Sequence, residues 1–333
     1  MKSAKLYMHR CLQLAQLGAY YVAPNPMVGA VLVGGDGQIL GEGWHERYGE
    51  AHAELNCLRN AEKNHPEGFN YKDCTLYVSL EPCSHYGKTP PCAKLIIEKG
   101  IGRVVVGCLD PNPRVAGRGV KMMQDAGIEV IVGVLESECR EVNKRFICLQ
   151  EEERPYVVLK WAQTSDGYID VEREEGNPMV ISTPLMKQLV HQQRAENMAI
   201  MVGTRTVLLD NPRLLTTHWS GRNPIRVTLD RHGVLPANSK IFSDESETIV
   251  YSENTDWKFI LKDLARRNIH SILVEGGAML LNHILDSGVY DEVHVEVGTA
   301  TLGEGIRGVK APDYVFNSTP QTIDGHLVYV EKR

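Results

Sequence analysis

The chain has 333 residues, of which 43% are hydrophobic and 23% charged, which is typical of a globular protein of about two domains. The net charge of −6 and the lack of a basic run argue against a nucleic-acid partner. No run of 18 apolar residues indicates a membrane span.

The first 21 residues predict an amphipathic helix and not a secretory signal, because basic residues separate the apolar ones: Leu6, Met8, Leu12, Leu14 and Leu17. All eight cysteines lie in the first half of the chain. Without a signal or a short disulfide framework, we expect reduced thiols and a cytoplasmic protein. Some of these thiols then suit a metal site, while Cys57, Cys74 and Cys108 are expected in the core.

Helix and strand patterns alternate along the first half, which predicts a three-layer α/β domain over residues 1–148. The glycine-rich turn at 34–37 predicts a hairpin between the first two strands. The expected strands are 28–33, 39–43, 75–80, 103–108 and 128–132, and the further helices are 51–63, 92–99 and 119–126.

A polar segment at 150–155 interrupts this pattern, and we place the domain boundary there, with a second domain over 149–333. The second half is also α/β. Its expected strands are 156–161, 198–203, 225–230, 247–251, 270–274 and 291–297, and its expected helices are 184–195, 257–267 and 278–286.

The strongest motif is His52-Ala53-Glu54, followed by Pro82-Cys83 and Cys92. Zinc favours imidazole and thiolate ligands, and a catalytic site keeps its fourth position for water. His52, Cys83 and Cys92 supply three ligands, and Glu54 could move the proton of that water as a general acid and base. Residues two apart on a helix do not share a face, so His52 and Glu54 can meet one ion only at a helix N-terminus.

Two other interpretations of this motif stay open. A closed structural zinc site would need a fourth ligand such as His85 or Cys74, and the chain could also bind no metal. We expect His85 to be a loop residue near the substrate.

The order His-x-Glu, Pro-Cys and Cys is the signature of zinc deaminases, although eight residues (84–91) separate the two cysteines here. The segments EPCSHYGKTPPC at 81–92 and PNPMVG at 24–29 resemble the bifunctional riboflavin-biosynthesis family of diaminohydroxyphosphoribosylaminopyrimidine deaminase/5-amino-6-(5-phosphoribosylamino)uracil reductases. The resemblance implies a cytidine-deaminase-like domain and a substrate contact for Asn25. Turn chemistry at Pro-Asn-Pro is the alternative for Asn25.

The second half has no Gly-x-Gly-x-x-Gly at a strand–helix turn, so a Rossmann site is not indicated. Glu275-Gly276-Gly277 follows a predicted strand and opens a helix, where a phosphate could approach backbone N–H groups. The resemblance extends over this half and implies a dihydrofolate-reductase-like fold that uses NADPH. Its motifs are Leu159-Lys160, Ser165-Asp166-Gly167, Ile181-Ser182, Arg194-Ala195, Val202-Gly203, Thr206-Val207-Leu208, Asp210-Asn211-Pro212 and Val274-Glu275-Gly276-Gly277.

By position, the resemblance implies a set of NADPH-binding residues: Ala162, Val180, Thr206, Asp210, Gly277, Ala278, Met279 and Leu280. It implies substrate binding by Arg194, Leu214 and Glu275, where Arg194 could grip a phosphate and Glu275 could accept hydrogen bonds. The alternatives are a solvated helix end for Arg194, packing for Leu214 and turn chemistry for Asp210.

The chain also departs from the family pattern. The family often has Arg where Thr217 stands, and His218 or Arg222 could compensate. The segment 171–177 is unusually charged.

These features together predict two reactions on a small phosphorylated pyrimidine, without nucleic acid or membrane, in a protein that we expect to be a homo-oligomer. The first is the hydrolytic deamination of 2,5-diamino-6-(ribosylamino)-4-pyrimidinone phosphate with zinc. The second is the reduction of the ribosyl to the ribityl chain with NADPH. The alternatives are a nucleoside or tRNA zinc deaminase with a passenger domain, and a zinc-stabilised binding protein without catalysis.

Overall fold

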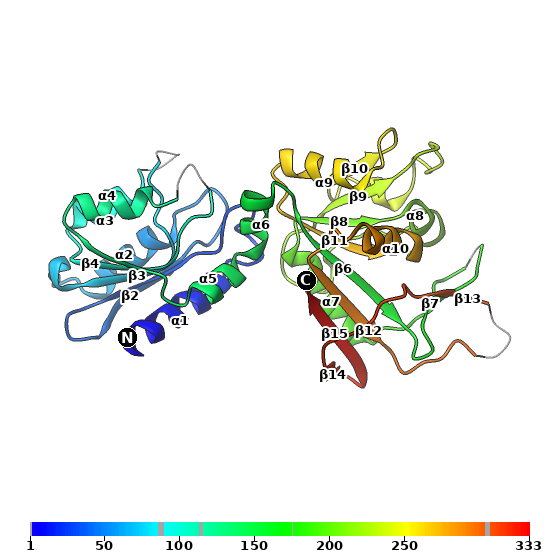
Figure 1. The fold of residues 1–333 in the computed structure, drawn as a ribbon, viewed down its shortest axis with the longest axis horizontal. Coiled ribbons are helices and arrows are strands. Elements are labelled where there is room, and N and C mark those ends of the chain that lie inside the picture. Colours follow the sequence, from blue (N-terminus) through cyan, green and yellow to red (C-terminus); the bar gives the residue numbers. More distant parts are fainter. Residues whose placement is uncertain (1, 86–89, 113–115, 175, 304–306) are drawn as a thin grey trace. The chain divides into compact units, whose positions relative to one another are not determined.

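A computed structural model describes residues 2–85, 90–112, 116–174, 176–303 and 307–333 (Figure 1). Two parts of the sequence analysis fall outside the described residues: Tyr86–Thr89, in the loop between the two cysteines, and Glu175, in the charged segment. The chain divides into two compact units, 1–152 and 153–333. Among the helices described, none has the length and apolar character needed to cross a membrane.

The first unit is built on a five-stranded sheet with the order β2-β1-β3-β4-β5. β1 pairs antiparallel with β2 and β3, while β3, β4 and β5 are parallel. The strands are β1 (Gly29–Val33), β2 (Ile39–Trp44), β3 (Thr75–Leu80), β4 (Arg103–Cys108) and β5 (Glu129–Val132).

Helices cover both faces of this sheet, so the expected three layers are confirmed. α1 (Lys2–Gln16) and α5 (Glu136–Val142) pack on one face. The other face carries α2 (Ala53–Asn64), α3 (Cys92–Lys99) and α4 (Arg118–Asp125).

Two glycines of β2 bring α2 unusually close to the sheet. A Cβ atom on Gly43 would lie 2.2 Å from the backbone nitrogen of Cys57, and one on Gly41 would lie 2.6 Å from that of Ala61. Because any side chain at these positions would push the helix away, the glycines fix where α2 begins and where its first residues lie.

The expected cysteines Cys57, Cys74 and Cys108 are buried, and all eight cysteines of the chain are free thiols. In α1 the buried positions include Met8, Leu12 and Leu14, whereas Leu6 is 66% exposed and Leu17, just after the helix, is 56% exposed. The amphipathic helix was therefore expected correctly, but its buried stripe is narrower than its apolar residues suggest.

The polar segment 150–155 is partly helical, because α6 (Lys144–Glu152) continues through its first half. Ile147, Cys148 and Leu149 are buried, so Glu151 and Glu152 belong to the solvent side of the same helix. Glu151 also pairs with Arg140 at 2.8 Å. The chain divides into its compact units after Glu152, within the polar segment where we placed the boundary.

The second unit contains an eight-stranded sheet with the order β10-β9-β8-β11-β6-β12-β15-β14, and a small β13-β7 pair. From β10 to β12 neighbouring strands are parallel, and β15 and β14 add an antiparallel edge. The bounds are β6 (Tyr156–Gln163), β7 (Tyr168–Val171), β8 (Ala199–Val202), β9 (Ile225–Leu229), β10 (Thr248–Tyr251), β11 (Ser271–Gly276), β12 (Glu292–Val297), β13 (Gly308–Lys310), β14 (Gln321–Ile323) and β15 (His326–Lys332).

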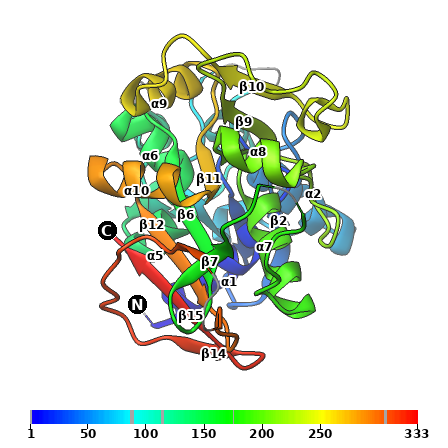
Figure 2. The same cartoon turned by 90° about the vertical axis from the view of Figure 1, so that its right-hand side faces the viewer.

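α9 (Trp257–Arg266) and α10 (Ala278–Ser287) bury apolar side chains against one face of this sheet. α7 (Pro184–Glu196) and α8 (Thr204–Asp210) lie on the opposite face of the sheet, where α8 packs on Ile200 and Val202. Figure 2 shows α8, α10 and β11 close together within this unit. The sequence analysis did not anticipate α5, α6, α8, or the strands β7, β13, β14 and β15.

Candidate active sites

Three potential metal ligands meet where α2 and α3 begin. His52 is the N-cap of α2, Cys92 is the first residue of α3, and Cys83 lies on the loop after β3. His52 Nδ1 lies 3.5 Å from Cys83 Sγ and 3.4 Å from Cys92 Sγ. All three ligand atoms lie within 4.8 Å of one another.

This donor set fits a tetrahedral zinc ion. With Zn–N near 2.0 Å and Zn–S near 2.3 Å, a nitrogen and a sulfur ligand should lie about 3.5 Å apart. A hydrogen bond from Cys92, aided by one from His52, lowers the pKa of the Cys83 thiol to about 4 despite its burial, which favours the thiolate that a metal binds. Among the described residues, the only such group has three members, so neither His85 nor Cys74 supplies a fourth ligand there.

Glu54 lies in the first turn of α2, two residues after His52, and is only 3% exposed. Because α2 begins at Ala53, both His52 and Glu54 are at the helix end, as their spacing required. Burial and the neighbouring Cys83 raise the pKa of Glu54 to about 7. A carboxyl group with such a pKa can both take up and release a proton near neutral pH.

Asn25 is hydrogen-bonded to His45, a residue close to His52 that the sequence analysis missed. His45 Nδ1 lies 3.0 Å from the carbonyl of Ala51, so this nitrogen carries the hydrogen. Burial lowers the pKa of His45, and the neutral ring can then accept from Asn25 Nδ2 at 3.1 Å through Nε2. The His45 ring meets the ring of His52 edge-on at 5.4 Å.

The loop that carries Cys83 is held by Glu81, another residue that the sequence analysis did not assign. Its buried carboxylate accepts hydrogen bonds from four backbone N–H groups, at 2.8 to 3.2 Å. The donors are Asp110, Gly117, Gly119 and Val120. Glu81 therefore joins the ligand loop to the start of α4.

In the second unit, several expected cofactor residues gather where parallel strands end, the usual ligand edge of such sheets. The N–H of Gly203 donates to the carbonyl of Gly276 at 2.9 Å, so the starts of α8 and α10 are neighbours. Thr206 Oγ1 lies 3.4 Å from where a Cβ of Gly277 would be. β11 pairs Val274 with Leu159, and Ala162 lies three residues further along β6.

The other expected cofactor residues have different surroundings. Asp210 ends α8 and forms an ion pair with Arg173 of the charged segment. Met279 of α10 is 83% exposed and Val180 is 72% exposed. Two residues after Val180, the hydroxyl of Ser182 donates to Glu296 at 2.6 Å. Glu296 of β12 is the register partner of Ala162, so this contact links the segment of Val180 to the strand that carries Ala162.

Arg194 and Glu275 form a buried, two-pronged ion pair. Arg194 Nε donates to Glu275 Oε1 at 2.8 Å and Nη2 to Oε2 at 2.6 Å, and the side chains are 16% and 11% exposed. Arg194 is therefore not a solvated helix end. Burial alone would raise the pKa of Glu275, but Arg194 and Lys160 outweigh it and leave the pKa below its usual value.

The strand assignment around Glu275 also changes, since β11 extends through Gly276 and includes it. Lys160 follows Leu159, the partner of Val274, on β6. Burial lowers the pKa of Lys160 against the pull of Glu275 and Glu296. A lysine inside the apolar run 156–162 was the signal that could have marked it as a site residue.

Leu214 packs its side chain into a small core cluster with Ile200, Val207 and Ile241, in agreement with the packing alternative. Its backbone is in the left-handed region, with φ of 54°. Next to it, the N–H of Thr217 donates to His191 Nδ1 at 3.0 Å, and His191 meets His218 edge-on at 4.7 Å. The departure at Thr217 thus lies beside a histidine pair.

Comparison with known proteins assigns each half of the chain. Residues 1–108 match the family described as cytidine and deoxycytidylate deaminase zinc-binding region, and residues 155–321 match the RibD C-terminal domain. The riboflavin biosynthesis protein RibD of Aquifex aeolicus is 39% identical over 91% of this chain and 88% of its own length. That of Escherichia coli is 36% identical over 91% and 89%.

Solved structures agree over the whole length. A Thermotoga maritima diaminohydroxyphosphoribosylaminopyrimidine deaminase/5-amino-6-(5-phosphoribosylamino)uracil reductase is 38% identical, with a TM-score of 0.87 and 99% of each chain covered. RibD of Acinetobacter baumannii is 32% identical, with a TM-score of 0.88 and coverage of 99% and 98%.

Proposed function

The chain belongs to the RibD family of riboflavin biosynthesis proteins, and on this basis we propose its substrate and a role for each site residue. It is a bifunctional deaminase and reductase with zinc and NADPH as its cofactors. The proposed substrate is 2,5-diamino-6-(ribosylamino)-4-pyrimidinone phosphate, which is deaminated by hydrolysis and then reduced from the ribosyl to the ribityl form.

In the deaminase reaction His52, Cys83 and Cys92 hold the zinc ion. Zinc, when bound, acidifies water so that it can act as a nucleophile near neutral pH. Glu54 takes the proton of the water that attacks the amine-bearing ring carbon, and it returns this proton to the departing ammonia. A buried carboxyl whose pKa is raised from its ordinary value by burial suits both steps.

Asn25 binds the pyrimidine. With its Nδ2 group donating to His45, its Oδ1 atom is left to accept from an N–H group of the substrate. His45 acts as a positioning residue, because its own hydrogen bond to Ala51 fixes which ring nitrogen can accept.

In the reductase reaction the NADPH site lies at the edge formed by Ala162, Thr206, Gly277, Ala278 and Leu280, with Val180, Asp210 and Met279 at its margin. NADPH supplies the hydride. Lys160 of β6, Glu275 of β11 and Arg194 of α7 bind the substrate. Leu214 contacts the substrate through its backbone. Arg194 keeps N–H groups beyond those given to Glu275 and Leu215, so it can still bind an anionic group.

We further propose that the enzyme works in the cytoplasm as a homo-oligomer on this small substrate, without nucleic acid or membrane. Eight free cysteines favour a reducing compartment, and the net charge of −6 disfavours polyanionic partners.

The observation that carries this proposal is the triad of His52, Cys83 and Cys92 beside the buried Glu54. The test supplies the pyrimidinone ribosyl phosphate to the purified protein with and without NADPH, and follows zinc content, ammonia release and NADPH absorbance. Ammonia release with substrate-dependent NADPH oxidation is expected. Zinc without either signal would favour a nucleoside or tRNA deaminase, and zinc with four protein ligands would favour a binding protein without catalysis.

A further inference from the structure

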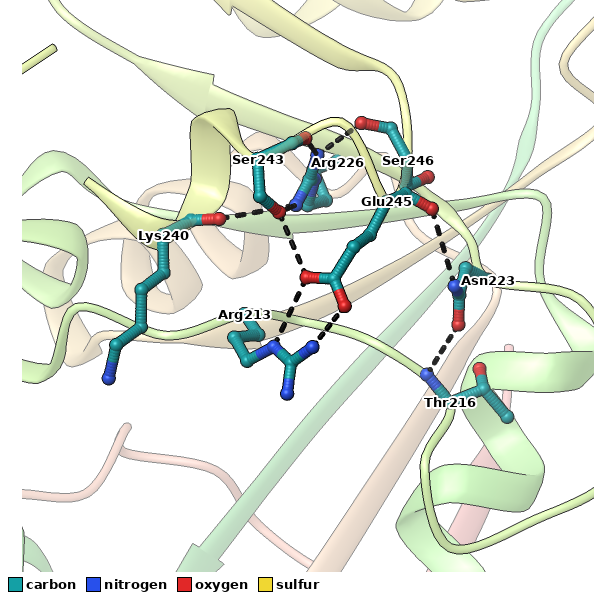
Figure 3. Close-up of polar contacts among 8 residues, drawn as sticks. All are labelled: Arg213, Thr216, Asn223, Arg226, Lys240, Ser243, Glu245 and Ser246. Carbon is teal, nitrogen blue, oxygen red and sulfur yellow. Dashed lines mark hydrogen bonds and ion pairs between the residues drawn. The ribbon is translucent and has the colours of Figure 1, made fainter. Parts of the chain in front are cut away.

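A polar network joins the reductase segment 211–217 to the loop at 240–246 (Figure 3). Its centre is Arg226 of β9, whose side chain is fully buried. Arg226 donates to the carbonyls of Lys240, Ser243 and Ser246 and to the hydroxyl of Ser243. This buried cation therefore fixes the course of the loop at 240–246.

That loop presents Glu245 to the 211–217 segment. The Glu245 carboxylate accepts from the Ser243 hydroxyl at 3.1 Å and forms an ion pair with Arg213. The backbone N–H of Lys240 donates to Asn211 Oδ1 at 2.7 Å, which ties down the beginning of the segment.

Asn223 completes the network at the centre of the segment. Its Oδ1 accepts from the backbone N–H of Thr216 at 3.0 Å, and its Nδ2 lies 3.4 Å from the carbonyl of Glu245. The Thr216 hydroxyl has no hydrogen-bond partner among the residues that the structure describes, so its N–H is the anchor of this residue.

The neighbours of Thr216 face the other way, toward the substrate residues. The carbonyl of Leu215 accepts from Arg194 Nη1 at 3.1 Å, and the N–H of Thr217 donates to His191 Nδ1 at 3.0 Å. Three consecutive residues are thus held from alternate sides. The segment also contains two residues with positive φ angles, Asn211 and Leu214. Such backbone conformations are unfavourable for residues other than glycine, so the segment depends on these contacts to keep its conformation.

We infer that Asn223 and Glu245 are positioning residues of the reductase site, which hold the 211–217 segment so that the Leu215 carbonyl orients Arg194 toward the substrate. This inference rests on the proposed role of Arg194. The contacts of Asn223 and Glu245 are with the segment and its supporting loop, so their loss should act through the position of Arg194 and leave the NADPH edge unchanged.

The test compares Asn223→Ala with Asn223→Asp, which keeps the acceptor for the Thr216 N–H. A matched control is Asn254→Ala, since Asn254 Oδ1 accepts from the N–H of Asp256 at 3.0 Å in another exposed turn of the same unit. Asn223→Ala should raise KM for the pyrimidine about three- to tenfold, the effect of one lost hydrogen bond, with kcat and KM for NADPH near wild type. Asn223→Asp and Asn254→Ala should keep the wild-type KM.

Deaminase activity of each variant reports whether the rest of the chain is intact. Hydrogen–deuterium exchange of the 211–217 segment gives a second readout that needs no substrate, and it should be faster in Asn223→Ala alone. Should the wild type fail to oxidise NADPH with this substrate, the proposed function fails, while the exchange result still decides whether Asn223 holds the 211–217 segment. An unchanged KM, an equal change in Asn254→Ala, or unchanged exchange at 211–217 would overturn the inference.

Discussion

Replacing Arg194 by Met should destabilise the second unit and abolish reductase activity together. The substitution leaves the Glu275 carboxylate, 11% exposed, without the two hydrogen bonds at 2.8 and 2.6 Å. Breaking a buried ion pair by removing one partner costs about 3–5 kcal/mol. Lys160 remains beside Glu275 and opposes its charge, so we expect the lower end, about 3 kcal/mol.

The double variant Arg194→Met/Glu275→Met separates stability from function. Replacing both partners by apolar side chains of similar size is often neutral, so most of the lost stability should return. Reductase activity should not return if the two charges bind the substrate. The deaminase activity of the same chain is the internal reference in both variants.

Urea unfolding followed by tryptophan fluorescence measures the stability, because three of the four tryptophans (Trp161, Trp219 and Trp257) belong to the second unit. At a slope of about 2 kcal/mol per M urea, the single variant should unfold about 1.5 M earlier than wild type. If the double variant regained reductase activity along with its stability, the pair would be structural only and the substrate assignment would be wrong.

Three further predictions concern other parts of the chain. Glu81→Gln should weaken zinc binding about 10- to 100-fold, measured by competition with a chelator, because the residue holds the Cys83 loop; unchanged affinity would remove its positioning role. Gly43→Ala should displace α2 and lower the thermal stability of the first unit and its deamination, and wild-type values for both would contradict the close packing. Burial holds the pKa of His191 at about 4, whereas the unfolded chain takes up this proton near pH 6.5. Stability of the second unit should therefore fall as the pH drops from about 6.5 to about 4. His191→Asn, which keeps an acceptor, should lessen this fall, and an identical pH profile would show that His191 is not its source.

The sequence was most informative where residue type alone restricts the chemistry. Imidazole, two thiols and one carboxyl at the spacing of His52, Glu54, Cys83 and Cys92 admit few uses other than zinc. The spacing of His52 and Glu54 also required a helix N-terminus, and the structure has α2 begin at Ala53. The long regular strands and helices followed from their apolar periodicity.

The reductase site was harder to predict from the sequence because it brings together residues that are far apart in the chain. No periodic pattern indicates that Arg194 and Glu275 pair, since they come from α7 and β11 and are brought together only by the sheet order. The helical state of residues 150–152 was missed for a related reason, because the polar residues after Leu149 complete the exposed side of a helix whose other side is buried.

The most direct test of the central claim is ammonia release by the Glu54→Gln variant, with zinc content measured on the same sample. The account predicts about one zinc per chain, as in wild type, because Glu54 is not a ligand. Deamination should fall about 100- to 10,000-fold, the usual contribution of a general acid and base, while reduction by NADPH of the already deaminated substrate is unchanged. Wild-type ammonia release by a zinc-loaded Glu54→Gln protein would contradict the account.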